Sequence, residues 1–477
     1  MKPYQIVLFN LSVFAGLLLI MLVFPENGIK VATAKLTFPT VEQFFEIDTA
    51  NFKSDIELAL DSIIKSKESA QQKVDSTIIK RTLDSLKAAK KRIQYPNNDP
   101  SVLFAFFEKL DNAKKKKVRI MHYGDSQIEA DRITAYVRNE LQKKFGGYGA
   151  GLFAVVDLTN KMSVKKTVSD NWKRYPGFGR KDSLVLHNKY GGLLSFCRFS
   201  PLEKTSEIHN AWIKIEKPTA SYGKTRTYYQ LNLFYGNSTI PFYCKLTSDG
   251  IVSFNDSITP KNTVQEKTFS FSATPKEILL TFSGKYSPDF YALSLEGNNG
   301  VVMDNIPLRG ASGTEFGAQD YGNLNQMFKL LKPDLLILQF GGNTIPYMKD
   351  EERCIKYGKW FSRQISMLKK MNPNAQVIVI GPSDMATKVN GEFTTYPLLP
   401  VVKNALKQAA FENNAAFWDM YEAMGGKNTM LEWAASDPPL AAKDYIHFSP
   451  EGAKKIATLF YDALLKDYES YKAQQKP

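Results

Sequence analysis

Three short segments of this sequence contain residue types that together can transfer an acyl group. They are Gly124-Asp125-Ser126-Gln127, Gly341-Gly342-Asn343 and the stretch 444–452, which contains an aspartate and a histidine. A serine hydroxyl is a poor nucleophile until a base takes its proton, and histidine is the usual base. A carboxylate orients that histidine and stabilises its charged form. The three segments therefore predict a serine nucleophile, a histidine base and an acidic partner.

We expect Ser126 as the nucleophile, His447 as the base and Asp444 as its carboxylate partner. Asp444 and His447 are three residues apart, so one turn can aim the carboxylate at one ring nitrogen while the other nitrogen faces the serine. Acyl transfer also needs donors to the oxyanion, each worth ~10²–10³ in rate. Asn343 can supply a side-chain amide, and Ser126 its backbone N–H at the start of a helix. Helix capping by Ser126 and turn capping by Asn343 are the structural alternatives.

The elements around these segments alternate between strands and helices. A strand at 118–123 precedes Ser126, and apolar spacing predicts a helix at 128–145. Further strands are expected at 334–340, 376–380 and 416–420, and further helices at 101–110, 354–371, 401–411 and 450–465. Alternating strands and helices predict an α/β fold with a doubly wound parallel sheet. In such sheets, binding sites form at the carboxyl ends of strands.

Residues 151–300 have a different pattern, with short strand-like runs and little helix. The expected strands are 212–215, 228–235, 240–246, 268–271, 278–282 and 290–295. Regularly spaced short strands are typical of a β-sandwich. The sequence therefore predicts an α/β domain in two parts, 99–150 and 301–470, interrupted by a β-sandwich. The aromatic side chains of the β-sandwich could stack on sugars, although core packing is expected for most of them: Trp172, Trp212, Tyr228 and Tyr229.

The N-terminus has the pattern of a targeting signal. Residues Ile6–Phe24 form a nearly unbroken apolar run after Lys2. Such a run approaches the ~30 Å hydrocarbon core and exceeds the ~7–15 apolar residues of a signal peptide. We therefore expect a single-pass transmembrane signal anchor within 1–34, in the inner membrane, with the catalytic domain in the periplasm. The alternative is secretion after cleavage at Ala34. The polar, lysine-rich segment 35–98 is expected to be a helical or flexible spacer.

Composition excludes some partners and leaves other features open. The formal net charge is +14, but no nucleic-acid motif accompanies it, so nucleic acid is not an expected partner. The spacing of Cys197, Cys244 and Cys354 fits neither a zinc site nor a redox pair. A Cys197–Cys244 disulfide and free thiols both remain open. No residue cluster indicates a metal, and no cofactor is expected.

Other polar residues near the three segments are expected to have structural roles. Asp125 would hold its loop, and His122 would pack in the core of its strand. The two histidines of the insertion are expected on the surface: His187 and His209. Three residues that follow the serine could line the pocket or lie on a solvated helix: Gln127, Asp131 and Arg132.

The three segments, with one more, resemble the ordered blocks of the SGNH or GDSL-like hydrolases. Ser126 matches the first block, and Gly313, in Gly-Ala-Ser-Gly-Thr, matches the second. Asn343 matches the third, and Asp444 with His447 matches the last. The resemblance implies a flavodoxin-like α/β fold. It also implies that the oxyanion hole is formed by the N–H groups of Ser126 and Gly313 with the Asn343 side chain.

A β-rich insertion after the first block is similar to that of peptidoglycan O-acetylesterases with an inserted carbohydrate-binding-like module. The glycine-rich segment 145–152 is similar to the chain that leads into that module. The resemblance implies removal of acetyl groups from the C6 hydroxyl of N-acetylmuramic acid. Gln127 is a departure, because relatives often have histidine there. Two alternatives stay open: an O-acetyltransferase supplied by a membrane-bound O-acyltransferase, and a non-catalytic glycan-binding protein.

Overall fold

The structure, a computed structural model, describes residues 29–31, 34–36, 84–85, 88–203, 206–219 and 221–475. The chain divides into two compact units, residues 1–88 and residues 89–477. In the first unit, the described strands β1 (Ile29–Val31) and β2 (Ala34–Leu36) pair antiparallel. The expected membrane anchor lies outside the described residues. Within the part of the chain that is described, no helix combines the length and apolarity needed to cross a bilayer.

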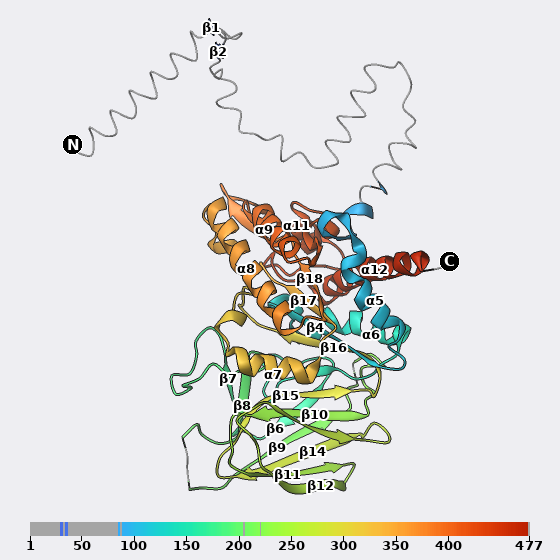
Figure 1. The fold of residues 1–477 in the computed structure, drawn as a ribbon, viewed down its shortest axis with the longest axis vertical. Coiled ribbons are helices and arrows are strands. Elements are labelled where there is room, and N and C mark those ends of the chain that lie inside the picture. Colours follow the sequence, from blue (N-terminus) through green and yellow to red (C-terminus); the bar gives the residue numbers. More distant parts are fainter. Residues whose placement is uncertain are drawn as a thin grey trace, which may run out of the picture. The chain divides into compact units, whose positions relative to one another are not determined.

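The second unit contains a sheet whose described strands follow the order β16-β4-β17-β18-β21-β3. These strands are β3 (Ile93–Gln94), β4 (Lys117–Gly124), β16 (Gly300–Pro307), β17 (Leu335–Gln339), β18 (Gln376–Ile380) and β21 (Ala416–Trp418). Figure 1 labels β16, β4, β17 and β18 of this sheet. The neighbours pair parallel except β3, which is antiparallel to β21. Taken in chain order, the parallel strands are arranged 2-1-3-4-5, the doubly wound order of flavodoxin-like folds. The predicted α/β fold is confirmed.

Helices cover both faces of this sheet. Along β17, Leu335 and Ile337 pack into one core, whereas Leu336 and Leu338 pack into the other. Continuous apolar strands of this kind are buried on both faces. The first core also receives α5 (Phe104–Asp111), α6 (Thr134–Phe145) and α12 (Pro450–Gln474). The second receives α7 (Tyr321–Leu331), α8 (Glu351–Met371) and α9 (Leu399–Glu412).

Two parts of this domain differ from the sequence expectation. The helix expected at 128–145 is broken into a 3-10 turn, η4 (Ser126–Asp131), and α6. Ala130 and Asp131 have φ values of 56° and 64°, a left-handed conformation that ends a helix, while the apolar spacing continues through the break. The sheet also takes β3 from the segment expected as spacer. A strand of two residues is too short to show periodicity in the sequence.

The insertion, from β5 to β15, consists of two antiparallel sheets. One sheet contains β5 (Gly151–Phe153), β7 (Lys173–Pro176), β8 (Ser195–Arg198), β10 (Gln230–Gly236), β13 (Gln265–Ser270) and β15 (Asp289–Glu296). The other contains β6 (Lys165–Val168), β9 (His209–Glu216), β11 (Phe242–Ser248), β12 (Ile251–Ile258) and β14 (Glu277–Gly284). Leu233 and Leu293 from the first sheet share a core with Ile213 and Leu280 from the second. This is the arrangement of a β-sandwich.

Side chains of the insertion settle several open points. Trp172 and Tyr228 are buried in the sandwich core, whereas Trp212 is exposed. Cys197 and Cys244 are buried free thiols, as is Cys354 in α8. His187 is only partly exposed, because its Nε2 lies 3.3 Å from Asp289 and near the Asn237 amide.

Short elements complete the described fold. They are η2 (Pro96–Asn98), η3 (Pro100–Leu103), η5 (Phe316–Ala318), η6 (Ile345–Tyr347), β19 (Ala386–Val389), β20 (Glu392–Thr395), α10 (Met420–Met424) and α11 (Thr429–Ala435). The hairpin of β19 and β20 lies beside the segment that carries His447, since Ala386 N donates to Tyr445 O over 3.1 Å.

One buried ion pair allows a test of this packing. Arg138 in α6 donates to both oxygens of Asp131, over 2.7 and 3.1 Å, and both side chains are buried. Removing one partner of such a pair costs ~3–5 kcal/mol because the other charge stays buried. Arg138→Leu is therefore expected to lower the free energy of unfolding by about that amount in chemical denaturation. Lys143→Leu, which removes the exposed Lys143–Glu140 pair of the same helix, should cost less than ~1 kcal/mol. Equal losses would contradict the account.

Candidate active site

The three segments predicted to carry chemistry meet at one edge of the parallel sheet. Ser126 follows β4, and Asn343 follows β17, which is the neighbour of β4. Backbone bonds join the two strand ends, because Asp125 N donates to Gln339 O over 3.3 Å. After β4 the chain continues to β16, on one side of β4 in the sheet, whereas after β17 it continues to β18, on the opposite side. That point is where doubly wound sheets leave room for a site.

Ser126, His447 and Asp444 form a hydrogen-bonded relay. Ser126 Oγ lies 2.9 Å from His447 Nε2, across a separation of 321 residues in sequence. His447 Nδ1 lies 2.8 Å from Asp444 Oδ2. With Nδ1 protonated toward the carboxylate, Nε2 is the basic nitrogen that faces the serine hydroxyl. This is the geometry that serine activation by a histidine–carboxylate pair requires.

The carboxylate of Asp444 is held by its own loop. Its Oδ1 accepts hydrogen bonds from the backbone N–H groups of Ile446 and His447, over 2.9 and 3.0 Å. Burial acts to raise the pKa of Asp444, but these hydrogen bonds and the imidazole outweigh burial and lower it. The side chain therefore stays ionised through mildly acidic pH and can stabilise an imidazolium.

Asp125 fixes the turn that presents Ser126. It is the N-cap of η4, and its Oδ1 accepts from Gln127 N over 2.9 Å. The side chain is buried, and burial raises the pKa of Asp125 to about 6. Its position agrees with the expected structural role, since it does not take part in the relay.

Gln127 and Arg132 connect the nucleophile turn to the loop that carries His447. Gln127 Nε2 donates to Ile446 O over 2.6 Å, and Arg132 donates to Phe448 O over 3.3 Å. Arg132 also donates to Ser126 O over 3.4 Å. Both residues were left open between a pocket and a solvated helix. Both side chains bridge the two loops, and Gln127 also lines the pocket beside the relay, as one of the two readings expected.

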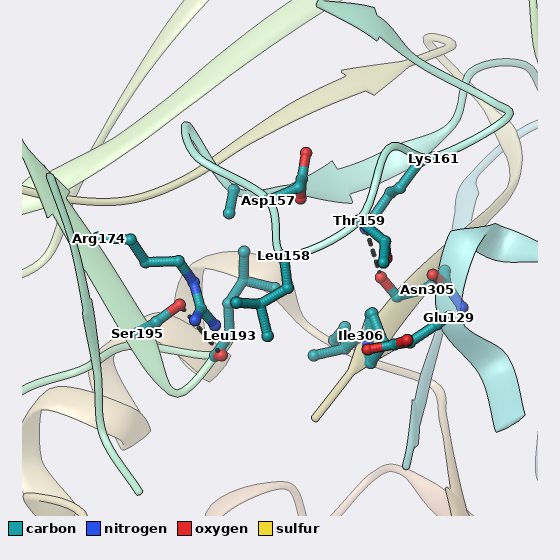
Figure 2. A pocket seen from close by; sticks show the side chains of 12 residues that line it. Glu129, Asp157, Leu158, Thr159, Lys161, Arg174, Leu193, Ser195, Asn305 and Ile306 are labelled. Atoms are coloured by element: carbon teal, nitrogen blue, oxygen red, sulfur yellow. Dashed lines mark hydrogen bonds between the residues drawn. The ribbon is translucent and has the colours of Figure 1, made fainter. Parts of the chain in front are cut away.

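The insertion also holds the nucleophile turn, a role that the sequence does not indicate. Met162 N donates to Ala130 O over 3.2 Å, and Ser163 Oγ donates to Asp131. Lys161 Nζ reaches Asn305 O on β16 over 2.7 Å, at the side of a hollow of about 30 Å³ (Figure 2). The α/β domain and the insertion therefore fix the turn from two sides.

A pocket of about 170 Å³ opens beside the relay. It is lined by Asp125, Ser126, Gln127, Gln339, Phe340, Gly342, Asn343, Pro346, Tyr347, Pro382, Ser383, Met385, Met420, Ile446 and His447. Asn343, the expected oxyanion donor, therefore shares the pocket with the relay. Its Nδ2 also donates to Ala311 O over 3.0 Å, which fixes the orientation of the amide.

Gly313, the other expected oxyanion residue, is buried and does not belong to that lining. Its φ is +82°, and a Cβ there would lie 2.5 Å from Phe361 and 2.7 Å from Phe340. The position therefore requires glycine for conformation and for space. Its role as an oxyanion donor stays a prediction.

His122, the histidine nearest to the relay in sequence, belongs to the core as expected. Its ring nitrogens lie 3.0 Å from Gln339 Oε1 and 3.0 Å from Thr134 Oγ1. Burial lowers the pKa of His122 to about 4, so the ring is neutral near pH 7. It supports the packing of β4 against β17 and does not compete with His447 as a base.

The doubly wound fold and the serine–histidine–aspartate geometry define a hydrolase of the serine type. Residues 268–455 match the model of the GDSL-like Lipase/Acylhydrolase family. The match includes Gly313, Asn343, Asp444 and His447, while Ser126 precedes it because the insertion separates the first block from the others. Residues 268–455 of this chain are therefore similar to GDSL-like acylhydrolases, and the relay at the sheet edge has the geometry that acyl transfer requires.

One similar solved structure shares this fold, and two others show weaker similarity. A peptidoglycan O-acetylesterase is 20% identical, with a TM-score of 0.58, over 78% of this chain and 98% of that chain. The acetyl xylan esterase AlAXEase is 16% identical, with a TM-score of 0.27, over 34% of this chain and 81% of that chain. A family two carbohydrate esterase from Clostridium thermocellum is 10% identical, with a TM-score of 0.26, over 63% and 99%. The first likeness shows a common fold. A search of curated proteins gives no significant match.

The raised pKa of Asp125 implies that the free energy of unfolding depends on pH. Its folded-state pKa of about 6 lies above the ordinary 3.8, so the folded protein binds more protons than the unfolded chain between these values. This group therefore makes stability fall as pH rises from about 4 to about 6, by roughly 2–3 kcal/mol. Asp125→Asn keeps the capping oxygen and should remove that dependence in denaturation curves at pH 4–7. Asp256→Asn on the exposed β12 is the control, and the same loss there would contradict the assignment.

Loss of the hydrogen bond from Gln127 to Ile446 O is expected to lower activity without lowering stability. Gln127→Leu removes the bond to Ile446 O and lets the loop of His447 shift, so kcat should fall roughly 10–100-fold. Gln127→His retains a ring N–H donor and should recover most of the activity. Hydrolysis of p-nitrophenyl acetate and thermal denaturation measure the two effects. Wild-type kcat in the leucine variant would show that the bond does not position the base.

Proposed function

We propose that this protein is a serine esterase that removes O-acetyl groups from a cell-envelope glycan, with peptidoglycan as its substrate. The observation that carries the proposal is the relay of Ser126, His447 and Asp444 at the mouth of a small pocket. A nucleophile of this kind attacks ester carbonyls, and the size of the pocket selects the acyl group.

The reaction follows from the relay. Ser126 Oγ attacks the acetyl carbonyl while His447 Nε2 takes its proton, and Asp444 stabilises the imidazolium. The tetrahedral oxyanion is stabilised by the Asn343 amide and the Ser126 N–H. Collapse expels the sugar hydroxyl, which leaves with the proton from His447. Water, deprotonated by His447, then attacks the acetyl-Ser126 ester, and acetate departs as Ser126 recovers its proton.

The pocket favours a short acyl group. Its volume of about 170 Å³ is below the ~300–1,000 Å³ of sites that enclose drug-sized ligands. Pro346, Pro382 and Met385 are among its walls, which suit a methyl group. An acetyl group can enter while the sugar stays outside. Tyr347 is 78% exposed at this pocket and offers a ring face on which a sugar can pack.

Two further observations support a glycan substrate. The insertion makes direct hydrogen bonds to the nucleophile turn, so a second module lies close enough to the catalytic centre to contact a polymeric substrate. The fold is also shared with a peptidoglycan O-acetylesterase. Peptidoglycan lies outside the cytoplasm. The apolar run Ile6–Phe24 would anchor the chain in the inner membrane, with the catalytic unit on the periplasmic side.

Ser126→Ala tests the chemistry. The full chain should release acetate from O-acetylated peptidoglycan, and the variant should lose about 10⁴-fold or more in kcat because the nucleophile is absent. Ser470→Ala, at an exposed position of α12 outside the pocket, is the matched control and should keep activity unchanged. Circular dichroism checks that each variant is folded. Wild-type activity in Ser126→Ala would contradict the proposal.

Substrate identity is tested by comparing polymers. Acetate release from O-acetylated peptidoglycan should exceed release from acetylated xylan at equal ester concentration. A preference for xylan would leave the esterase chemistry intact and overturn the choice of glycan. If added acceptor glycan lowers free acetate while the donor ester is still consumed, the reaction is transfer to a hydroxyl.

A further inference from the structure

A second cavity, of about 310 Å³, lies at the junction of the insertion and the α/β domain. This junction cavity is lined by the first residues of β4, by β10, β13 and β15, and by the C-terminal end of α7. Figure 1 shows α7 lying beside β15 and β10. The start of β4 belongs to the amino edge of the parallel sheet, opposite the edge that carries Ser126. The junction cavity and the catalytic pocket share no described lining residue.

The floor of the junction cavity is one face of a sheet of the insertion. Leu233 turns toward the sandwich core, whereas Gln230 and Asn232 turn to the other face, because side chains alternate along a strand. Asn232 lies opposite Thr268 on β13 and Ser294 on β15. A sheet face that packs against another layer is normally apolar. Here polar side chains from adjacent strands enclose space instead of filling it.

Two buried polar atoms in the lining of the junction cavity lack a partner, one at its floor and one on β4. Asn232 Oδ1 and Arg119 Nε make no hydrogen bond within the described residues, although each residue is only 3% exposed. Leaving a buried polar atom unpaired is destabilising, so such atoms in a native fold call for an explanation. Water can occupy a polar cavity of this size, and ligand hydroxyls that reproduce the bonds of that water can replace it.

The charges of the lining select the kind of ligand. Lys117, Arg119 and Lys332 bring positive charge, and Glu266 and Glu296 bring negative charge. Lys117 Nζ lies 2.5 Å from Glu296 Oε2, and Arg119 also pairs with that carboxylate. An anion would meet two carboxylates, and a cation would meet three cationic groups. A neutral molecule whose hydroxyls both donate and accept can satisfy the donors and the acceptors together.

The shape of the cavity agrees with a ring-shaped ligand. Phe234, Leu330 and Leu331 supply an apolar strip beside the polar floor, and the C–H face of a sugar ring can pack on it. Glu266 and Thr268 are exposed, so the cavity opens to solvent and a chain can continue outward. A volume of about 310 Å³ is near the lower end of ligand sites, ~300–1,000 Å³.

We propose that the junction cavity binds one neutral pyranose unit of a glycan chain, at a site separate from the catalytic pocket. Binding there needs no ester and no turnover, so it goes beyond the esterase activity proposed above. It would hold a polymer while Ser126 acts on another unit, which raises the effective concentration of ester at the catalytic pocket.

Calorimetric titration of the full chain tests the proposal without catalysis. The probes are unacetylated β-1,4-linked hexamers of N-acetylglucosamine, glucose and xylose, with inorganic phosphate as an anionic probe. Asn232→Leu removes the unpartnered oxygen from the floor, and Glu266→Ala removes an acceptor from the exposed mouth. Asn255→Leu, on the exposed β12 of the other sheet, is the matched control. Thermal denaturation of every variant checks folding, and Glu266→Ala keeps the test decisive if Asn232→Leu is unstable.

We expect at least one hexamer to bind the wild-type chain and the Ser126→Ala variant equally. Its Kd should rise about tenfold in Asn232→Leu and severalfold in Glu266→Ala, as the loss of one hydrogen bond implies, and stay unchanged in Asn255→Leu. The proposal is overturned if no hexamer binds, if Glu266→Ala and folded Asn232→Leu bind as tightly as wild type, or if phosphate binds in their place. Loss of esterase activity with hexamer binding intact would count against the proposed function alone.

Discussion

The hydrogen bond between Ser126 Oγ and His447 Nε2 depends on the whole α/β domain, because its two ends are 321 residues apart in sequence. The parallel sheet brings them together. β4 delivers Ser126 to the carboxyl edge, and the loop before α12 delivers His447 to the same edge. At a distance of 2.9 Å, small movements of either loop would change the geometry of proton transfer. The remaining contacts of the site serve to hold these two loops still.

Those contacts come from three directions. Asp125 caps the start of the turn, while Gln127 and Arg132 hydrogen-bond it to the loop of His447. Met162 and Ser163, from the insertion, bind the far end of the turn at Ala130 and Asp131. The insertion is therefore part of the catalytic scaffold as well as a separate β-sandwich. A change in its packing would be expected to reach the nucleophile through these bonds.

The sequence predicts the sheet and the three segments because these are local signals. Apolar runs mark buried strands such as β17, and chemically distinctive residues follow the strand ends. Residue spacing does not reveal bonds between segments distant in sequence. The bonds of Gln127 and Arg132 to the loop of His447 join residues 319 and 316 positions apart in sequence. The left-handed conformation of Ala130 and Asp131 likewise gives no signal in the apolar spacing.

The polar floor of the junction cavity is likewise not predictable from residue spacing. Gln230, Asn232 and Glu296 look like the exposed side of an ordinary strand until the α/β domain covers them. The sequence does not predict β3, because a strand of two residues is too short to show alternating polarity. It does not predict β12, because most of that strand is exposed and lacks an apolar face. The chemistry of the site is therefore readable from residue types. The way in which the insertion supports the site requires tertiary structure.

Covalent labelling tests the central claim most directly. A fluorophosphonate probe reacts with a serine whose hydroxyl is activated by a neighbouring base, and peptide mass spectrometry locates the adduct. The account predicts stoichiometric modification of Ser126, lost in Ser126→Ala and slowed at least 100-fold in His447→Ala. An adduct on another serine, or equal labelling rates with and without the imidazole, would contradict it.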